Sequence, residues 1–237
     1  MENQNIEVSQ HKAARIVGYM FLFGMAASVF AFVVRGSLFV QGNAAGTAIN
    51  IMAHERQFRT AIAFDLITAV SVLVLLWAFY VLLKPVNRNL ALLGAFLRLM
   101  EVAFWCVILV MNFGVLEILN NADLSKTFET RQLQAMSRVI VRIWNDGYTV
   151  GFVLLCLGST VFNFLLFKSN YIPKALAGLG LFSSTLFLVC SFTIIIFPGF
   201  TNIVGIYYMG PMAIYEVSLG FLFAIKGAKI HQMKSGN

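Results

Sequence analysis

Long apolar stretches separated by short polar segments set the pattern of this chain. The longest stretch without a charged side chain covers residues 175–215, between Lys174 and Glu216. A helix crosses the hydrocarbon layer of a bilayer with about 20 apolar residues, so this stretch is long enough for two crossings. Pro198 and Gly199 lie near its middle, where a turn between the crossings is expected. The pattern predicts membrane-spanning helices.

The same pattern predicts six spanning helices along the chain. Each begins and ends close to a charged or polar residue, and each is near the length that a bilayer requires. The predicted spans are residues 16–34, 61–83, 89–117, 148–167, 175–197 and 210–225. We therefore expect residues 1–237 to form a single all-α domain, a polytopic membrane bundle of six transmembrane helices.

Two of the predicted connections are longer than turns. Residues 37–58 contain an apolar segment, residues 48–52, that is expected to form a short helix at the surface. The connection between the third and fourth spans, residues 118–146, is the longest. Within it, apolar residues recur at spacings of three and four: Leu133, Met136, Ile140 and Trp144. This spacing predicts an amphipathic segment in the outer loop, either an interfacial helix or an extension of the fourth span.

Composition excludes a soluble protein and indicates which binding partners are expected. The chain is 59% hydrophobic and 11% charged, whereas soluble domains carry roughly 25% charged residues. Its net charge is +7. No loop holds the dense basic run of a nucleic-acid-binding surface, so the excess of Lys and Arg indicates membrane orientation and contact with lipid headgroups. Membrane lipids are expected partners, and nucleic acid is not.

The distribution of basic residues predicts the orientation in the membrane. One side holds the N-terminal segment, the connections 84–88 and 168–174 and the C-terminal tail, where Glu2 and Glu7 are the acidic residues. These segments carry Lys12, Arg15, Lys84, Arg88, Lys168, Lys174, Lys226, Lys229 and Lys234. Because cytoplasmic loops carry an excess of Lys and Arg, we expect a multi-pass protein of the cytoplasmic membrane with both termini cytoplasmic.

Three charged residues fall deep within predicted spans. Arg98 and Glu101 are three residues apart on the third span and share a helix face, and Glu216 lies on the sixth. At about 1.5 Å of rise per residue, all three are near the bilayer midplane. Ionisable groups at this depth are unfavourable unless they are paired or wetted, so they are candidate binding residues. The trio holds one carboxylate more than it has guanidinium groups.

A second cluster is expected near the outer edge, where counting along the helices brings Arg35, Arg59 and Asp65 together. Two interpretations remain open for both clusters. Each is either a buried ion-pair network that fixes the register of the helices, or part of a substrate or proton site. In the second case Glu101 or Glu216 would be the group that titrates.

Several kinds of chemistry have no residues to support them. The three histidines, His11, His54 and His231, all lie outside the predicted spans, so no ligand set for haem, a di-iron centre or another metal is found. No catalytic residues and no glycine-rich phosphate loop are recognised. We therefore expect no cofactor, and enzymatic activity is not favoured.

Several segments together resemble one bacterial family. They are Phe32–Gly36, Arg56–Arg59 with Asp65, Lys84–Leu93, Phe96–Leu99, Ser169–Gly178 and Pro211–Gly227 with Glu216. The chain is similar over nearly its whole length to the family called domain of unknown function 4386. The resemblance implies a six-helix integral protein of the bacterial inner membrane, and it carries no established activity with it.

Three functions are compatible with these residues. The first is a small transporter or a lipid- or anion-binding membrane protein, with its site at Arg98, Glu101 and Glu216. A small anionic ligand is favoured by external positive charge on Arg35, Arg56, Arg59, Arg138 and Arg142. The second is a structural or accessory subunit that packs on another membrane subunit or on its own copies. The third, an intramembrane enzyme using Glu101 or Glu216, ranks last.

Overall fold

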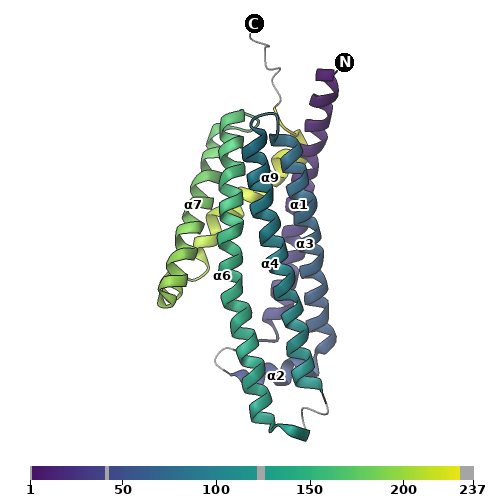
Figure 1. Ribbon diagram of the computed structural model, residues 1–237, viewed down its shortest axis with the longest axis vertical. Coiled ribbons are helices and arrows are strands. Elements are labelled where there is room, and N and C mark those ends of the chain that lie inside the picture. The colour runs from purple at the N-terminus through teal and green to yellow at the C-terminus, as the bar shows by residue number, and fades with distance from the viewer. Residues whose placement is uncertain (1, 41–42, 122–125, 230–237) are drawn as a thin grey trace. The chain divides into compact units, whose positions relative to one another are not determined.

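The computed structural model describes residues 2–40, 43–121 and 126–229, and every regular element within them is helical. Lys234 and His231 lie outside these residues, as do the side chains of Glu2, Glu7 and Trp144. Six of the helices are long and apolar enough to cross a membrane (Figure 1). They are α1 (Glu2–Gly36), α3 (Glu55–Leu83), α4 (Arg88–Asn120), α6 (Thr130–Ser169), α7 (Lys174–Ile196) and α9 (Gly210–Lys226). The prediction of six spanning helices is confirmed.

Most of these helices extend past the predicted spans. The amphipathic segment at residues 133–144 is not part of a loop, because α6 begins at Thr130 and runs without a break into the fourth span. Of the two alternatives, the extension of this span is therefore correct. Leu133 is buried on one face, while Arg138 and Arg142 are exposed on the other. A continuous helix satisfies its own backbone groups through both environments, so the change from apolar to amphipathic sequence does not end it.

The shorter elements lie in two connections. The helix α2 (Ala44–Ala53) confirms the short helix expected around residues 48–52, and the side chain of Asn43 caps it by accepting from the backbone N–H of Gly46 at 2.8 Å. Between α7 and α9 stand η1 (Pro198–Phe200), α8 (Thr201–Val204) and η2 (Tyr207–Met209). The turn expected at Pro198 and Gly199 is thus present, because α7 ends at Ile196 and η1 begins at Pro198.

The chain divides into two compact units, and α1, α3, α4 and α6 contribute residues to both. The first unit comprises residues 1–23, 71–102 and 150–237, and the second comprises residues 24–70 and 103–149. The second unit has a small core in which Ile51 of α2 and Phe58 of α3 are almost wholly buried with Leu116 of α4.

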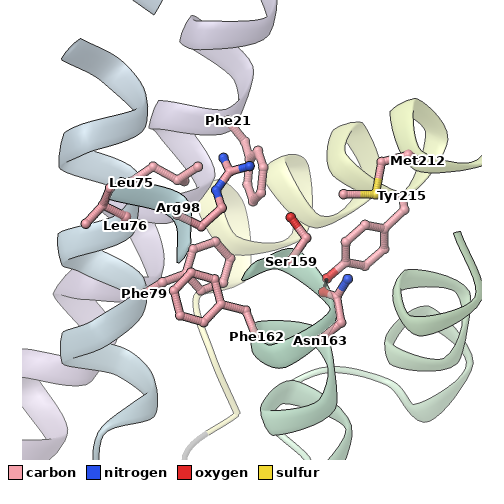
Figure 2. Close-up of a pocket in the computed structure, with 10 residues that line it drawn as sticks. All are labelled: Phe21, Leu75, Leu76, Phe79, Arg98, Ser159, Phe162, Asn163, Met212 and Tyr215. Atoms are coloured by element: carbon pink, nitrogen blue, oxygen red, sulfur yellow. Dashed lines mark hydrogen bonds between the residues drawn. The ribbon is translucent and has the colours of Figure 1, made fainter. Parts of the chain in front are cut away.

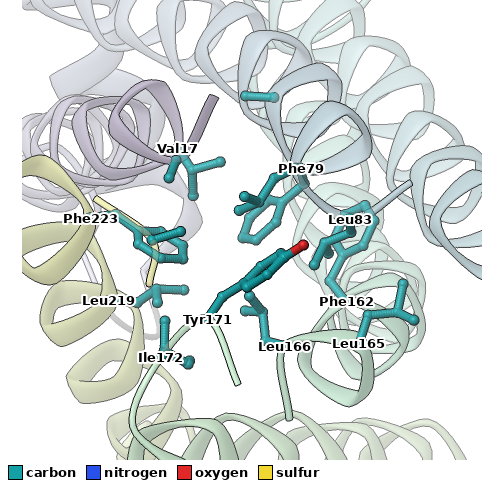
Figure 3. Packing of buried hydrophobic residues seen from close by; sticks show 14 of the residues in the cluster. Val17, Phe79, Leu83, Phe162, Leu165, Leu166, Tyr171, Ile172, Leu219 and Phe223 are labelled. Atoms are coloured by element: carbon teal, nitrogen blue, oxygen red, sulfur yellow. The ribbon is translucent and has the colours of Figure 1, made fainter. Parts of the chain in front are cut away.

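The core of the first unit draws on all six long helices. Figure 3 shows Tyr171 enclosed by Val17 of α1, Phe79 of α3, Leu166 of α6 and Phe223 of α9. The remaining helices, α4 and α7, add Ala91 and Ala177, neither of which has exposed surface. Small residues at these positions let neighbouring helices approach closely, which is the usual basis of helix packing in membranes.

One end of the first unit brings together four segments that are distant in the sequence. The buried amide of Gln10 on α1 donates to the carbonyl of Leu82 at 3.1 Å and to the hydroxyl of Tyr171 at 2.8 Å. The backbone N–H of Lys229 donates to the carbonyl of Tyr171 at 2.9 Å. The four segments predicted to be basic therefore meet at the same end, and their cytoplasmic orientation stays a prediction.

We predict opposite effects for two glycine substitutions in this unit. A Cβ atom at Gly18 of α1 would collide with the backbone of α9 at Gly220 and Ala224, whereas one at Gly178 of α7 meets no atom within 4 Å. Gly18→Ala should destabilise the protein by about 1–3 kcal/mol, the usual penalty of overpacking. Gly178→Ala should stabilise it slightly, because Ala is favoured over Gly in a helix by about 1 kcal/mol. Thermal unfolding in one detergent compares the two variants directly, and equal effects would contradict the close packing of α1 on α9.

Candidate functional site

A buried ion pair on α4 forms the centre of the candidate site. Nη1 of Arg98 lies 2.8 Å from Oε2 of Glu101, and the two side chains are only 6% and 5% exposed. The two residues are one helical turn apart, as their spacing predicted. The long stem of Arg98 fits because α6 presents Gly158 to it. A Cβ atom at Gly158 would lie 2.6 Å from Cγ of Arg98.

Glu216 lies on the packed side of α9. The buried residues of this helix follow a helical stripe of Met212, Tyr215, Leu219 and Phe223, and Glu216 stands beside that stripe and is half-buried. Its carboxylate interacts electrostatically with the guanidinium of Arg98 and with the carboxylate of Glu101. The structure therefore brings the three predicted residues together. Within the described residues, Glu216 forms neither a salt bridge nor a hydrogen bond.

The charges of this trio do not balance when all three groups are ionised. Arg98 supplies one positive charge, and Glu101 and Glu216 supply two negative charges. Two carboxylates near each other in a medium of low polarity repel strongly, and an uncompensated charge there is unfavourable by several kcal/mol. The arrangement can be relieved by a proton on one carboxylate or by a bound cation. It does not favour an anion at the trio itself.

Beside the trio, a hydrogen-bonded network joins α6, α7 and α9. The hydroxyl of Tyr215 donates to Oδ1 of Asn163, and Nδ2 of Asn163 donates to the carbonyl of Gly180 at 2.9 Å. The hydroxyl of Ser184 donates to the same carbonyl at 2.8 Å. All four residues are buried, and Gly180 admits them because a Cβ there would overlap the ring of Tyr215. Sequence reasoning missed Asn163 and Tyr215, although an Asn inside an apolar span is a signal that could have identified the first.

A small cavity connects this network to the ion pair. Its polar lining comes from Arg98, Ser159, Asn163 and Tyr215, which Figure 2 shows around one space, with the hydroxyl of Tyr215 directed at Asn163. The rings of Phe79 and Phe162 are stacked, with their centroids 4.8 Å apart, and form part of its apolar wall. The cavity has room for about one water molecule.

The second predicted cluster is an ion pair between two helices of the second unit. Arg35 of α1 pairs with Asp65 of α3, and the two side chains are 5% and 15% exposed. Arg35 also forms a side-chain hydrogen bond with Tyr148 of α6. The ring of Tyr148 meets the ring of Trp105 on α4 edge to face, with centroids 4.4 Å apart. One residue from each of four helices thus contributes to this cluster.

Arg59 does not join the cluster, so the prediction of a three-residue group is corrected. Its Nε lies 2.6 Å from Oε1 of Glu55, one turn earlier on α3, and the side chain is half exposed. The reason is helical geometry, because Arg59 and Asp65 are six positions apart and therefore lie about 120° apart around the helix. Among the other arginines that were expected to supply external positive charge, Arg56, Arg138 and Arg142 are exposed. Arg35 does not fit that expectation, because it is 4% exposed and paired with Asp65.

The chain was compared with models of protein families, with curated proteins and with solved structures. A family model with the description "Domain of unknown function (DUF4386)" matches residues 16–227. Neither a curated protein nor a solved structure matches the chain. The matched range contains every residue of the two clusters and of the polar network described above.

We predict that the buried and exposed Arg–Glu pairs differ strongly in their effect on stability. Arg98→Met should destabilise the protein by about 3–5 kcal/mol, because breaking a buried pair leaves an uncompensated charge. Arg59→Met is the matched control, and an exposed pair of this kind contributes at most about 1 kcal/mol. The double variant Arg98→Met, Glu101→Met should recover part of the loss, since neither charge is then left alone. Thermal unfolding of the four proteins measures this, and equal losses in the two single variants would contradict the burial of Arg98.

Proposed function

The chain belongs to the DUF4386 family of unknown function, and from that premise we propose that it is a small transporter that binds and releases a proton at Glu216. The observation that carries this proposal is the placement of an unpaired carboxylate beside a buried ion pair, within the spanning segment Tyr207–Lys226.

In this proposal the guanidinium of Arg98 can pair with either of two carboxylates, that of Glu101 or that of Glu216. With a proton on Glu216, the guanidinium of Arg98 is balanced by Glu101 alone, as in the 2.8 Å pair of this structure. When Glu216 releases the proton, its carboxylate competes with Glu101 for the same guanidinium. Glu101 is on α4 and Glu216 is on α9. Proton release from Glu216 therefore favours a salt bridge of Arg98 with α9 over the one within α4. A ligand or proton that favours one of two such arrangements shifts the population between them, which is the basis of coupled transport.

A purely architectural role for the trio is less well supported. An ion pair fixes the register of two helices only when its partners stand on different helices. Arg35 and Asp65 meet that condition, because they join α1 to α3. Arg98 and Glu101 both stand on α4, so their pair fastens no second helix in place. For this reason we assign the architectural role to the pair of Arg35 and Asp65 and the titrating role to the trio.

The solute that travels with the proton is proposed to be a small anion. In the second unit the exposed basic side chains of the described residues, which include Arg56, Arg138 and Arg142, outnumber the exposed carboxylates of Glu117, Glu129 and Asp146. An excess of one sign raises the local concentration of solutes of the opposite sign. At the trio, an anion meets less repulsion when Glu216 carries a proton. An anion and a proton would therefore move in the same direction.

An accessory role in a membrane complex is the second candidate. Many large apolar side chains of the described residues are exposed, including Phe32, Val110 and Phe182 at more than half of their surface. Surfaces of this kind face lipid in any membrane protein, so they favour the accessory role only weakly. The transport proposal has the more specific support.

Charge movement in response to a pH jump tests the proposal. The purified protein in proteoliposomes on a solid-supported membrane should give a transient current when the external pH is changed, because a proton enters or leaves the carboxylate of Glu216 within the span. Glu216→Gln should abolish this current. Glu129→Gln is the matched control, since Glu129 is an exposed carboxylate outside the spans, and it should retain the current.

Each outcome of this experiment decides the proposal. Glu216→Gln should also keep the thermal stability of the wild-type protein, because the carboxylate has no partner among the described residues to lose. A stable Glu216→Gln protein with an unchanged current would refute proton binding at this residue. A wild-type protein with no current at any pH step would refute it as well.

A further inference from the structure

The cavity is lined by residues of α1, α3, α4, α6 and α9, and some of its polar groups have hydrogen-bonding capacity that the protein itself does not use. A guanidinium carries five N–H donors in fixed directions and no acceptor. Arg98 is 5% exposed, and the salt bridge that it forms with a described residue is that of Nη1 with Glu101. That contact lacks the geometry of a hydrogen bond. The donors of a buried guanidinium therefore need a further acceptor.

Ser159 presents a second unused polar group to the same space. Serine in a helix commonly donates to the carbonyl of its own preceding turn, as Ser137 and Ser184 do to Leu133 and Gly180. Ser159 of α6 makes no hydrogen bond with a described residue, and its hydroxyl lines the cavity beside Arg98 (Figure 2). Two polar groups with unused hydrogen-bonding capacity thus line the same cavity.

The hydroxyl of Tyr215 supplies a third polar contact. Its hydrogen is donated to Oδ1 of Asn163, so its oxygen keeps lone pairs that can accept. Tyr215 is 1% exposed and also lines the cavity. A buried water is plausible only where the space is polar, is large enough for one molecule and offers two to four polar partners. This cavity meets all three conditions.

We infer that this cavity is a binding site for one internal water molecule, held by Arg98, Ser159 and Tyr215. The water accepts from the guanidinium of Arg98 and donates to the hydroxyl oxygens of Ser159 and Tyr215. It therefore joins the ion pair on α4 to the network of Tyr215, Asn163 and Gly180 on α9, α6 and α7. An ion is less suitable than a neutral molecule, because Arg98 and Glu101 together carry no net charge.

This water gives Arg98 a freedom that a dry cavity would not. A guanidinium that changes partners in an apolar core passes through arrangements in which its donors have no acceptor, and each such group is unfavourable by several kcal/mol. An adjacent water supplies the acceptor during the change. The water site stands on cavity geometry and unused donors, so it does not depend on proton binding at Glu216.

Hydroxyl-radical labelling by X-ray radiolysis tests the water site, with mass spectrometry as the readout. Radicals formed from a bound water modify the side chains next to it even when these are shielded from bulk solvent. Tyr215 and Met212, which are 1% and 4% exposed and line the cavity, should be modified in the intact protein. Phe223 on the same helix has no exposed surface, does not line the cavity and should stay unmodified.

Two substitutions at Ser159 separate the presence of water from the loss of the hydroxyl. Ser159→Leu fills the cavity and should abolish the labelling of Tyr215 and Met212. Ser159→Ala also removes the hydroxyl but leaves the space open, so labelling should persist. Glu216→Gln should leave the labelling unchanged, which keeps this test independent of the proton proposal.

The wild-type measurement alone can overturn the inference, so it does not rely on the folding of a variant. If Tyr215 and Met212 are labelled no more than Phe223, the cavity is dry and the site does not exist. Equal labelling in folded Ser159→Leu and Ser159→Ala proteins would also overturn it, because the radicals would then come from another source.

Discussion

The structure depends on one constraint, the satisfaction of polar groups where water is scarce. In hydrocarbon every backbone N–H and C=O needs a partner within the protein, which leaves helices as the available spanning form for this composition. The connection between α7 and α9 obeys the same constraint, since η1, α8 and η2 keep its backbone in short helical turns. Charged side chains also need partners in this environment, and each buried guanidinium of the two clusters has a carboxylate beside it. Among the charged residues of these clusters, Glu216 forms no salt bridge with a described residue.

Two ion pairs, each between a guanidinium and a carboxylate, have different consequences for the fold. The pair of Arg35 and Asp65 links α1 to α3 and is extended by Tyr148 and Trp105, so it connects four helices of the second unit. The pair of Arg98 and Glu101 is confined to α4 and leaves a carboxylate of α9 close by without a partner. The same chemistry thus joins two helices in one place and leaves a carboxylate without a salt bridge in the other.

Glycine residues create the space in which buried polar side chains can stand. Gly158 admits the stem of Arg98, and Gly180 admits Tyr215 together with Asn163. In each case the missing Cβ lies on a helix that faces a polar residue of another helix, so polar groups are enclosed without a break in the helices. The result is a polar region of the first unit that reaches from the ion pair on α4 to α7.

The sequence by itself determined the number, the order and the approximate ends of the spanning helices, because a bilayer imposes a length and a composition on each. It also identified Arg98, Glu101 and Glu216, since a charge within an apolar span is conspicuous without any structure. It failed at Arg59, where counting by depth ignored the angle around the helix, and it missed Asn163 and Tyr215. Only the tertiary structure decided which side chains on different helices face each other. As a result, Arg98 forms its salt bridge with Glu101, and Glu216 forms none with a described residue. That choice depends on the rotation of each helix and on the space at Gly158 and Gly180, which hydrophobic pattern and length do not specify.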